Sequence, residues 1–502
     1  MAPTTHPGDF SAGVAETNEK ADLAITTDQR DDDIDPVAEN QFRWRLDLGF
    51  LTIGFLSYMF KYIDQTNISN AKLLSKVVLT IAEQAQPNTS LFSIGYMIML
   101  FPSCILISHI GPAIWLPSCE VCLFFCLSRF PLIWGVLTCC LSLVTDARQC
   151  SWKMLTNRKV YGIRFFIGFC EATMWPAYFT MISQWYMPNE VALRMSIYNM
   201  AQPAGAMLSG AMQGALSTNL EGHMNRSGWR WAFIINGVCT IVVALLGYVL
   251  LPGYPERPNK LASWYLRRQD YDVALARSRR IGREPQRGLT VKSFIRAFTF
   301  WELWAVAIAW PFGGNTAPTS YFNLYLQSLK NSDGTLTYSV AMLNYLPIIG
   351  QAVQLVAELL FSGFSDLTGQ RLPFLILHSA ISLTSLSIII ARPQNRPLHM
   401  AGYYLNYIGD VSMMLLCAWA SDHLRGEPEV RTLLFATGTI IFYALSAFLP
   451  IAAFPASEAP NWKIGAKPYL GFAVASLLMF IGIHIGFKRE ARKRELKEDS
   501  KE

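Results

Sequence analysis

The chain has 502 residues, of which 52% are hydrophobic and only 16% are charged, and its formal net charge is +6. Soluble globular domains carry about 25% charged residues, so this composition indicates a membrane protein and disfavours a soluble enzyme or a nucleic-acid-binding protein. The ten cysteines fall almost entirely within apolar segments. They indicate neither a disulfide framework nor a bound metal.

Residues 1–43 precede the main part of the first apolar segment. They are rich in acids and lack apolar periodicity, so we expect a disordered, cytoplasmic N-terminal tail. The start of the chain has no basic stretch followed by an apolar run and a small-residue cleavage site. The first membrane helix is therefore expected to direct insertion.

Twelve segments contain the roughly 20 mostly apolar residues that a helix needs to cross the ~30 Å hydrocarbon core. A basic connector at 253–300 divides the twelve segments into two groups of six. The tail at 488–502 is also basic. Basic segments stay in the cytoplasm, so we expect both termini there, with six-helix halves at 44–252 and 301–487. The expected spans are 46–66, 91–110, 113–145, 160–185, 195–216, 231–251, 302–327, 337–362, 372–391, 399–419, 432–454 and 467–487.

The sequence GFSDLTGQR lies in the expected cytoplasmic turn between the eighth and ninth spans. The spacing of Gly363, Asp366, Gly369 and Arg371 resembles the gating motif of major facilitator transporters, in which the acid caps a neighbouring helix and the Arg meets cytoplasmic carboxylates. The matching turn of the first half, ISHIGPAIW at 107–115, lacks the acid and the Arg. A gate at that turn is expected to rely on packing alone.

Two six-helix halves around a charged connector are also the layout of that superfamily. We therefore expect an all-α membrane protein with the major facilitator fold, twelve transmembrane helices and a substrate site near the bilayer midplane.

Ionisable side chains inside the spans identify the candidate site, because each costs about 2.5–3.5 kcal/mol at the bilayer centre and needs a partner or a cavity. Lys61 and Asp64 lie one turn apart in the first span, and Arg164 and Glu171 lie on one face of the fourth. In a facilitator half both spans line the cavity. The cations are predicted to hold a substrate carboxylate while an acid carries a proton, with Glu120 of the third span as a further proton-coupling candidate.

Structural explanations stay open for most of these residues. Lys61 and Asp64 could lie at the extracellular end of their helix, with Lys61 reaching the surface and Asp64 hydrated. Arg164 could serve only as a partner of Glu171, and Glu120 could bind a neighbouring helix end. Glu171 is the strongest functional candidate.

The second half is expected to contribute polar rather than charged groups. Tyr321 and Gln351 rank first among them as substrate-binding candidates, ahead of neighbours such as Gln354, although amides often join helices instead. Asn88 forms a glycosylation sequon in an expected outside loop.

Five stretches together resemble one fungal group: FKYIDQTNISNA, RFFIGFCEA, PTSYFNLYLQSL, GWRWAFIINGV and WASDHLRGEPEVRTLLFATG. They are similar to the anion:cation symporter family of the major facilitator superfamily, the allantoate permease group, and most closely to its pantothenate-transporter branch. The likeness runs from about Leu46 to Arg489.

This resemblance implies proton-coupled uptake of a carboxylate nutrient such as pantothenate, allantoate, nicotinate or biotin across the plasma membrane. Asp64, Arg164 and Glu171 match the family positions for anion binding and proton coupling. Asn67 of the first stretch is counted with the substrate-binding residues. Because Gln65 follows Asp64 where the wider family has Arg, a positive charge there must come from Lys61. We expect a monomer in the bilayer, with an organic anion and a proton as partners and without a cofactor.

Three stretches depart from the family pattern. Residues 122–133 lengthen the third span, and residues 149–158 place basic side chains on an expected outside loop, against the positive-inside tendency. We hypothesise that one or both are translated intron, which spliced transcripts that retain them would disprove. Asp410, an acid in the tenth span, marks a changed substrate or an added proton site.

We consider three candidate functions for this sequence. The first is a proton-coupled importer of a small organic anion, and the second is a facilitator that moves a product or precursor of a secondary-metabolite pathway. The third, a nutrient sensor, would need a longer signalling extension than these tails provide. Phosphate-cradling loops, paired-His zinc motifs and other catalytic patterns are absent from the sequence, so an enzyme is not expected.

Overall fold

The computed structural model describes most of the helical part of the chain. The described residues are 35–74, 85–121, 165, 168–219, 228–286, 288–314, 316, 321–329, 337–393, 395–454 and 462–499. Arg164 and both hypothesised insertions lie outside them.

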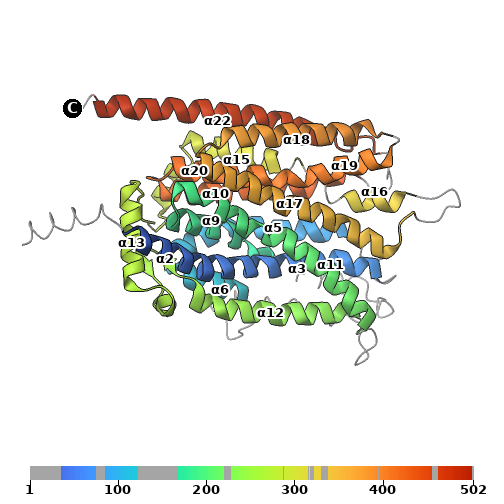
Figure 1. The fold of residues 1–502 in the computed structure, drawn as a ribbon, viewed down its shortest axis with the longest axis horizontal. Helices are drawn as coiled ribbons and strands as arrows, with labels where there is room; N and C mark the ends of the chain where they lie inside the picture. The colour runs from blue at the N-terminus through green and yellow to red at the C-terminus, as the bar shows by residue number, and fades with distance from the viewer. Residues whose placement is uncertain are drawn as a thin grey trace, which may run out of the picture.

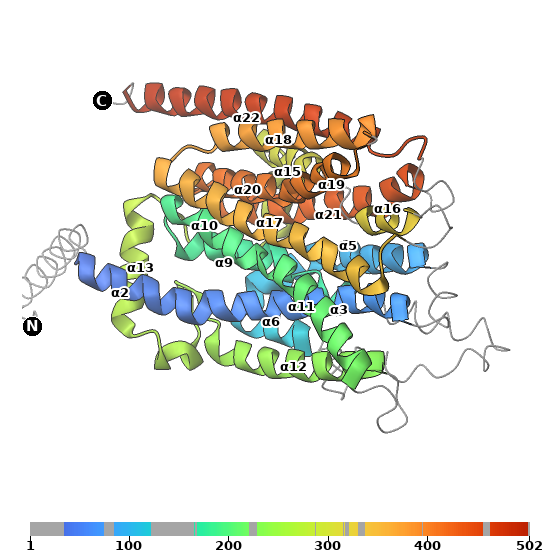
Figure 2. The ribbon, with the colours of Figure 1, turned by 45° about the vertical axis from the view of Figure 1, so that its right-hand side comes forward.

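The long helices run roughly along the long axis of the molecule, with the N-terminal half on one side and the C-terminal half on the other (Figures 1 and 2). The connector helix α13 (Arg268–Arg280) lies at one end, which we call the α13 end. The first described helix, α2 (Pro36–Leu46), and the end of the last, α22 (Lys467–Asp499), lie at that same end (Figures 1 and 2).

The N-terminal half follows the expected order of apolar segments. Its packing joins α3 to α11 and α12, and α6 to α12. The helices are α2, the π-helical turn η1 (Asp47–Leu51), α3 (Thr52–Leu74), α5 (Ala85–Ile110), α6 (Pro112–Val121), α9 (Met174–Trp185), α10 (Pro188–Asn199), α11 (Ala201–Asn219) and α12 (Gly228–Leu250).

The C-terminal half is built in the same way, with α15 packed on α21 and α22, and α18 on α22. Its elements are α15 (Trp301–Gly314), α16 (Phe322–Ser328), α17 (Val340–Thr368), α18 (Leu372–Ala391), α19 (Arg396–Asn406), the 3₁₀ turn η6 (Tyr407–Asp410), α20 (Val411–His423), α21 (Pro428–Ala453) and α22.

The connector between the halves is folded. A two-stranded antiparallel ribbon pairs β1 (Gly253–Tyr254) with β2 (Arg257–Pro258). The 3₁₀ helix η4 (Lys260–Trp264), α13 and α14 (Val291–Ala297) follow.

Six helices of the described part are long and apolar enough to span a membrane. A described helix also overlaps each of the twelve expected ranges. The count of twelve spans stays a prediction that the element order supports. The six are Pro36–Ile63, Phe92–Ile110, Tyr345–Thr368, Leu372–Ala391, Pro428–Leu449 and Lys467–Lys493.

Two expected spans are interrupted. The range 302–327 holds both α15 and α16, and α15 ends at Gly313 and Gly314, residues of low helix propensity. The range 399–419 is divided by η6, which ends at Asp410. Short 3₁₀ turns inside helices often mark functional positions, so Asp410 is a candidate functional residue.

The tails differ from expectation. The segment expected to be disordered up to residue 43 is helical from Pro36, and Asp35 caps this helix by accepting a hydrogen bond from the backbone N–H of Val37 (3.0 Å). Phe42 is fully buried, so burial of apolar surface stabilises this part of the tail. At the other end, α22 continues through the expected basic tail to Asp499.

The two halves pack directly on each other, with α10 and α11 against α17 and α5 against α21. Within the N-terminal half, a Cβ added at Gly205 of α11 would lie 2.7 Å from the carbonyl oxygen of Met59 on α3. Glycine at this position therefore permits close approach of two membrane helices.

Candidate functional site

Lys61 and Glu171 form an ion pair between the first and fourth spans. The Lys61 Nζ lies 3.7 Å from Glu171 Oε2, and the Gln65 side chain donates a hydrogen bond to the same oxygen (3.0 Å). Lys61 is on α3, and Glu171 lies in the helical residues that precede α9. We call Lys61, Gln65 and Glu171 the lysine cluster.

The lysine cluster is removed from solvent. Lys61 and Glu171 are each only 1% exposed. The alternative in which Lys61 reaches the membrane surface is therefore wrong. A buried cation requires a compensating anion, and here Glu171 provides it.

Aromatic rings surround the Lys61 ammonium. Its Nζ lies 4.8 Å from the ring centroid of Tyr96 and 5.5 Å from that of Tyr58, distances at which cation–π attraction operates. Tyr96 in turn packs against Tyr443 of the C-terminal half, with ring centroids 4.3 Å apart. The lysine cluster therefore lies near the boundary between the halves, where a transporter binds its substrate.

A second polar cluster crosses that boundary. Asn199 of α10 donates a hydrogen bond to Glu358 Oε1 on α17 (3.0 Å). Gln354 Nε2 donates both to Glu358 Oε1 (2.9 Å) and to Asp410 Oδ2 (2.9 Å). We call Asn199, Gln354, Glu358 and Asp410 the interface cluster.

The interface cluster holds two carboxyl groups close together. Glu358 is fully buried, and both acids bond to the same Gln354 nitrogen. In the described part of the chain, these two acids accept hydrogen bonds from neutral amide side chains, including Gln202 at Asp410. Two neighbouring carboxylates repel each other when both are ionised, so protonation of one of them stabilises the arrangement.

Tyr62 connects the two clusters. It follows Lys61 on α3, and its side chain bonds to that of Tyr58. The hydroxyl of Tyr62 also lies within electrostatic reach of Glu171, Glu358 and Asp410. Tyr62 therefore lies between the lysine cluster and the interface cluster.

The gating motif joins the halves at the α13 end. Asp366 at the end of α17 accepts a hydrogen bond from the backbone N–H of Leu193 on α10 (2.7 Å). Arg371 bonds to Asp366, donates to the carbonyl oxygen of Pro188 (2.7 Å) and lies 3.6 Å from Asp422.

The two glycines of this motif have different surroundings. Gly369 has a φ of +66° and ends α17, a conformation that disfavours side chains with a Cβ. A Cβ at Gly363 would only reach ordinary contact, 4.0 Å, with Leu193.

Other polar pairs reinforce the closure at this end. Ser196 bonds to Ser362, and Ser183 lies 3.1 Å from Ser421 across the boundary. Arg277 of α13 pairs with Glu190 at the start of α10 (2.6 Å). The described conformation is thus closed at the α13 end.

The matching turn of the first half corrects one expectation. It was expected to rely on packing, yet Ser108 accepts a hydrogen bond from the backbone N–H of Leu289 in the connector (2.9 Å). The His109 ring nitrogen Nε2 lies 3.1 Å from the Leu289 carbonyl oxygen. The connector thus supplies polar contacts at this turn, although the turn lacks the acid and the Arg of the gating motif.

Arg283 of the connector caps the end of α9. Its guanidinium donates to the carbonyl oxygens of Gln184 (2.7 Å) and Tyr186 (2.6 Å), groups left without helical partners. Burial, with the neighbouring charge of Arg431, lowers the pKa of Arg283 to about 9. The side chain is still charged at neutral pH.

Several expected site residues are only partly placed. Asp64 and Asn67 lie on α3, Glu120 on α6 and Asn88 in the first turn of α5 rather than in a loop, but their side chains are outside the described part. Their proposed roles stay predictions, as does that of Arg164.

The two candidates of the second half lie apart from the clusters. Tyr321 stacks on Phe454 with centroids 4.3 Å apart, at the end opposite α13. Gln351 is half-buried on α17, whereas its neighbour Gln354 makes the contacts to Glu358 and Asp410. The ranking of Gln351 above Gln354 therefore does not match the observed hydrogen bonding.

Glu358 is the residue that the sequence analysis missed. The second half was expected to supply polar rather than charged groups, yet this acid is buried in its eighth span. The signal was available, because an ionisable residue inside an apolar helix is the criterion that selected Glu171.

One further group of side chains has metal-ligand chemistry. Ligand atoms of Glu302, His423 and Glu490 all lie within 4.8 Å of one another, on α15, α20 and α22. His423 Nε2 is 3.3 Å from Glu490 Oε2 and its ring stacks on Phe487. The contact between His423 and Glu490 accounts for two of these three side chains, and the group shares no residue with either cluster.

Two helical halves, apolar helices of membrane-spanning length and buried charges at their boundary define a multi-pass membrane transporter. The chain belongs to the Major Facilitator Superfamily, which it matches over residues 50–424. Proteins of this family are transporters and not enzymes.

The relatives and solved structures support the same class. The chain is 26% identical to the MFS transporter PfmaC of Pestalotiopsis fici, over 93% of this chain and 83% of that one. It is 23% identical to the pantothenate transporter FEN2 of Saccharomyces cerevisiae, over 88% and 82%. The fold resembles the proton:xylose symporter XylE of E. coli with a TM-score of 0.66 and 14% identity, over 86% and 94%. The similarity to a pantothenate transporter agrees with the resemblance found in the sequence.

Proposed function

We propose that this protein imports a small organic anion together with a proton. The observation that carries the proposal is the buried ion pair of Lys61 and Glu171 beside the boundary of the two halves. The similarity to pantothenate transporters supports a carboxylate such as pantothenate, with allantoate and nicotinate as alternatives. A fungal plasma membrane and a monomeric state fit this role.

Charge balance gives the mechanism. Lys61 needs one anion nearby, which is Glu171 when the site is empty. When Glu171 takes up a proton, the carboxylate of a substrate replaces it beside Lys61. One proton and one monoanion therefore enter together, and the site keeps the same net charge.

The interface cluster and the gating motif connect this exchange to movement of the halves. Asn199 and Glu358 lie on different halves, as do Leu193 and Asp366. Opening at the α13 end must break both hydrogen bonds. We infer that substrate and proton binding at the lysine cluster, relayed by Tyr62, weakens the contacts of the interface cluster and allows the halves to rock.

The substrate is tested by uptake. The protein is produced in fungal cells that lack their own pantothenate, allantoate or nicotinate uptake. Entry of each labelled compound is measured across about pH 5–7.5, a range above the ordinary carboxyl pKa of ~4. We expect faster uptake of one compound at acidic pH, because the proton gradient drives it.

The control is Lys61→Gln, with surface amount measured by a tag. Export of a product, the alternative function, would instead lower the cellular content below that of cells without the protein. No uptake of any of the three compounds by protein present at the plasma membrane would refute this choice of substrates.

A further inference from the structure

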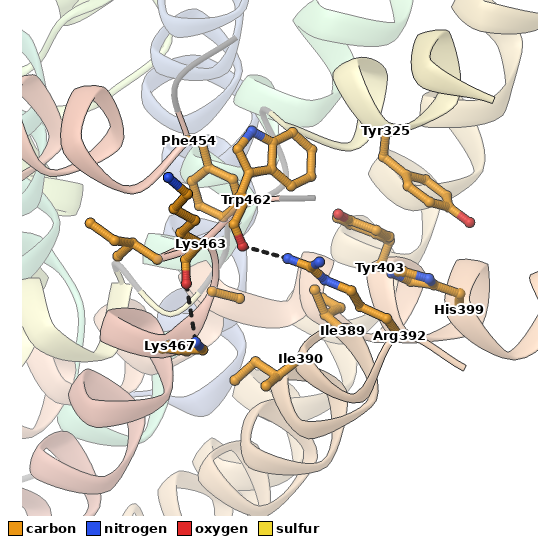
Figure 3. A pocket seen from close by; sticks show the side chains of 13 residues that line it. Tyr325, Ile389, Ile390, Arg392, His399, Tyr403, Phe454, Trp462, Lys463 and Lys467 are labelled. Carbon is orange, nitrogen blue, oxygen red and sulfur yellow. Dashed lines mark hydrogen bonds between the residues drawn. The ribbon is translucent and has the colours of Figure 1, made fainter. Parts of the chain in front are cut away.

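A separate pocket lies at the end of the C-terminal half opposite α13. It has a volume of about 360 Å³, in the range of small-molecule sites. The walls come from the end of α18, from α16 and α19, from the residue after α21, and from residues 462–467 at the entrance to α22 (Figure 3). We call it the distal pocket, and it is lined by Tyr325, Ile389, Ile390, Arg392, His399, Tyr403, Phe454, Trp462, Lys463, Ile464, Gly465, Ala466 and Lys467.

One wall is flat and aromatic. His399 and Tyr403 stack with an interplanar angle of 9°, and Tyr325 lies 4.5 Å from His399 between ring centroids. Phe454 and Trp462 pack edge to face on another side, 5.1 Å apart (Figure 3). Such surfaces favour a planar or apolar ligand body.

The rim is cationic. Arg392, Lys463 and Lys467 all line the pocket, and none of the lining residues that the structure describes is acidic. The Lys467 Nζ donates to the Lys463 carbonyl oxygen (3.0 Å), and Arg392 donates to the Trp462 carbonyl oxygen, so both side chains are held over the pocket (Figure 3). This charge favours an anionic group.

Arg392 occupies a strained backbone position. Among the described residues it is the one non-glycine with positive φ, at 47°, where it ends α18. Gly or Asn usually fills such a position, because a larger side chain costs roughly 1–2 kcal/mol there. Strain of this kind is found preferentially where a side chain serves a site.

We propose that the distal pocket binds a small amphiphilic anion, with a carboxylate or phosphate at the cationic rim and a planar or apolar body against the aromatic wall. Two sources share this chemistry, a soluble aromatic carboxylate and the head group of an anionic lipid. The pocket is an accessory site, because its described lining residues all belong to the C-terminal half and lie outside the lysine and interface clusters. Since rocking of whole halves leaves a pocket inside one half intact, its ligand stays bound through the transport cycle.

The test uses the purified full-length protein in neutral detergent and labelled benzoate as the probe, with equilibrium dialysis as the measurement. Benzamide, which has the same shape without the charge, is the competitor that separates charge from shape. The double variant Arg392→Gln/Lys463→Gln is compared with Arg396→Gln, an exposed cation nearby that does not line the pocket. Lys463→Glu, an exposed single change, replaces the double variant if that variant does not fold.

We expect saturable benzoate binding that benzamide does not displace. The double variant should raise Kd by about ten-fold or more, and Arg396→Gln by less than about two-fold, since a tenfold change equals ~1.4 kcal/mol. Asp366→Asn should leave the affinity unchanged. In nanodiscs, displacement of benzoate by phosphatidylserine but not by phosphatidylcholine would assign the pocket to a lipid head group, and no displacement by either to a soluble anion.

Equal competition by benzamide would overturn the proposal, as would unchanged affinity in both Arg392→Gln/Lys463→Gln and Lys463→Glu. Benzoate binding that is lost in Lys61→Gln and kept in the double variant would place the probe at the lysine cluster. That result would refute the accessory site and leave the proposed import function standing.

Discussion

Lys61 is a cation without access to water, so its neighbours determine what it can bind. Glu171 and Gln65 contact each other across the first and fourth spans, and Tyr96 covers the ammonium. Replacing Glu171 by a neutral group of the same shape imitates its protonated form. This allows the two steps of the proposed symport, anion binding and proton release, to be separated by mutation.

Glu171→Gln should abolish accumulation of substrate against its gradient but retain exchange of internal for external substrate. The reason is that Lys61 then always prefers the substrate carboxylate, while no proton can leave. Lys61→Gln is the matched change and should lose both activities. Exchange and net uptake are measured in parallel in proteoliposomes, and pH-driven accumulation by Glu171→Gln would contradict this role.

Glu358 gives a second residue-scale prediction. Glu358→Gln keeps a hydrogen-bonding group for Asn199 and Gln354, so uptake should fall by no more than about three-fold. Glu358→Ala leaves buried amides unsatisfied, at a cost of about 1–3 kcal/mol each, and should lower both uptake and thermal stability. Gln351→Ala, two turns earlier on α17, is the control. Equal loss in Glu358→Gln and Glu358→Ala would instead indicate that the negative charge is required.

At the scale of elements, the contacts between α10 and α17 hold the molecule closed at the α13 end. Asp366 and Arg371 reach Leu193, Pro188 and Asp422, so one motif connects both halves. Removing one member of a buried charged pair leaves the other uncompensated. The closed conformation should then lose stability relative to the open one.

Arg371→Gln should increase opening at the α13 end. Ser183 faces Ser421 in the closed state and is only 1% exposed, so a cysteine introduced by Ser183→Cys reports the opening through its labelling rate. After subtraction of labelling at the native cysteines, Arg371→Gln should label Ser183→Cys at least about ten-fold faster than the unchanged motif does. The reason is that loss of a buried charged partner destabilises the closed conformation by ~3–5 kcal/mol. Leu367→Ala, at an exposed neighbour on α17, should leave the rate unchanged. An unchanged rate in Arg371→Gln would show that the motif does not control this end.

The elements also show what sequence reasoning can reach. Apolar length predicted where helices lie, and charge inside apolar runs selected Lys61 and Glu171, which do meet. The same criterion would have found Glu358. The bond between Asn199 and Glu358, the turn at Asp410 and the bonding of the connector to Ser108 depend on how helices distant in sequence pack. Periodicity along one helix contains no information about those contacts.

At the scale of the whole molecule, two halves closed at one end enclose buried charges at their boundary. In the proposed mechanism, the lysine cluster keeps one positive and one negative charge in either state, whether the anion is Glu171 or substrate. The same mechanism requires that the protonation of the interface cluster does not change during the cycle. Transport of a monoanion with one proton should therefore be electroneutral and insensitive to membrane potential.

The most direct test of this coupling follows protons and substrate together. Purified protein is reconstituted in liposomes that contain a pH-sensitive dye, and labelled substrate identified by the cell assay is added outside without a pH gradient. The proposed mechanism predicts that substrate entry acidifies the interior of the liposomes, with about one proton per anion. A potassium diffusion potential should not change the rate of entry. The variant Glu171→Gln should lose the acidification. Substrate accumulation without acidification, or acidification that persists in Glu171→Gln, would contradict it.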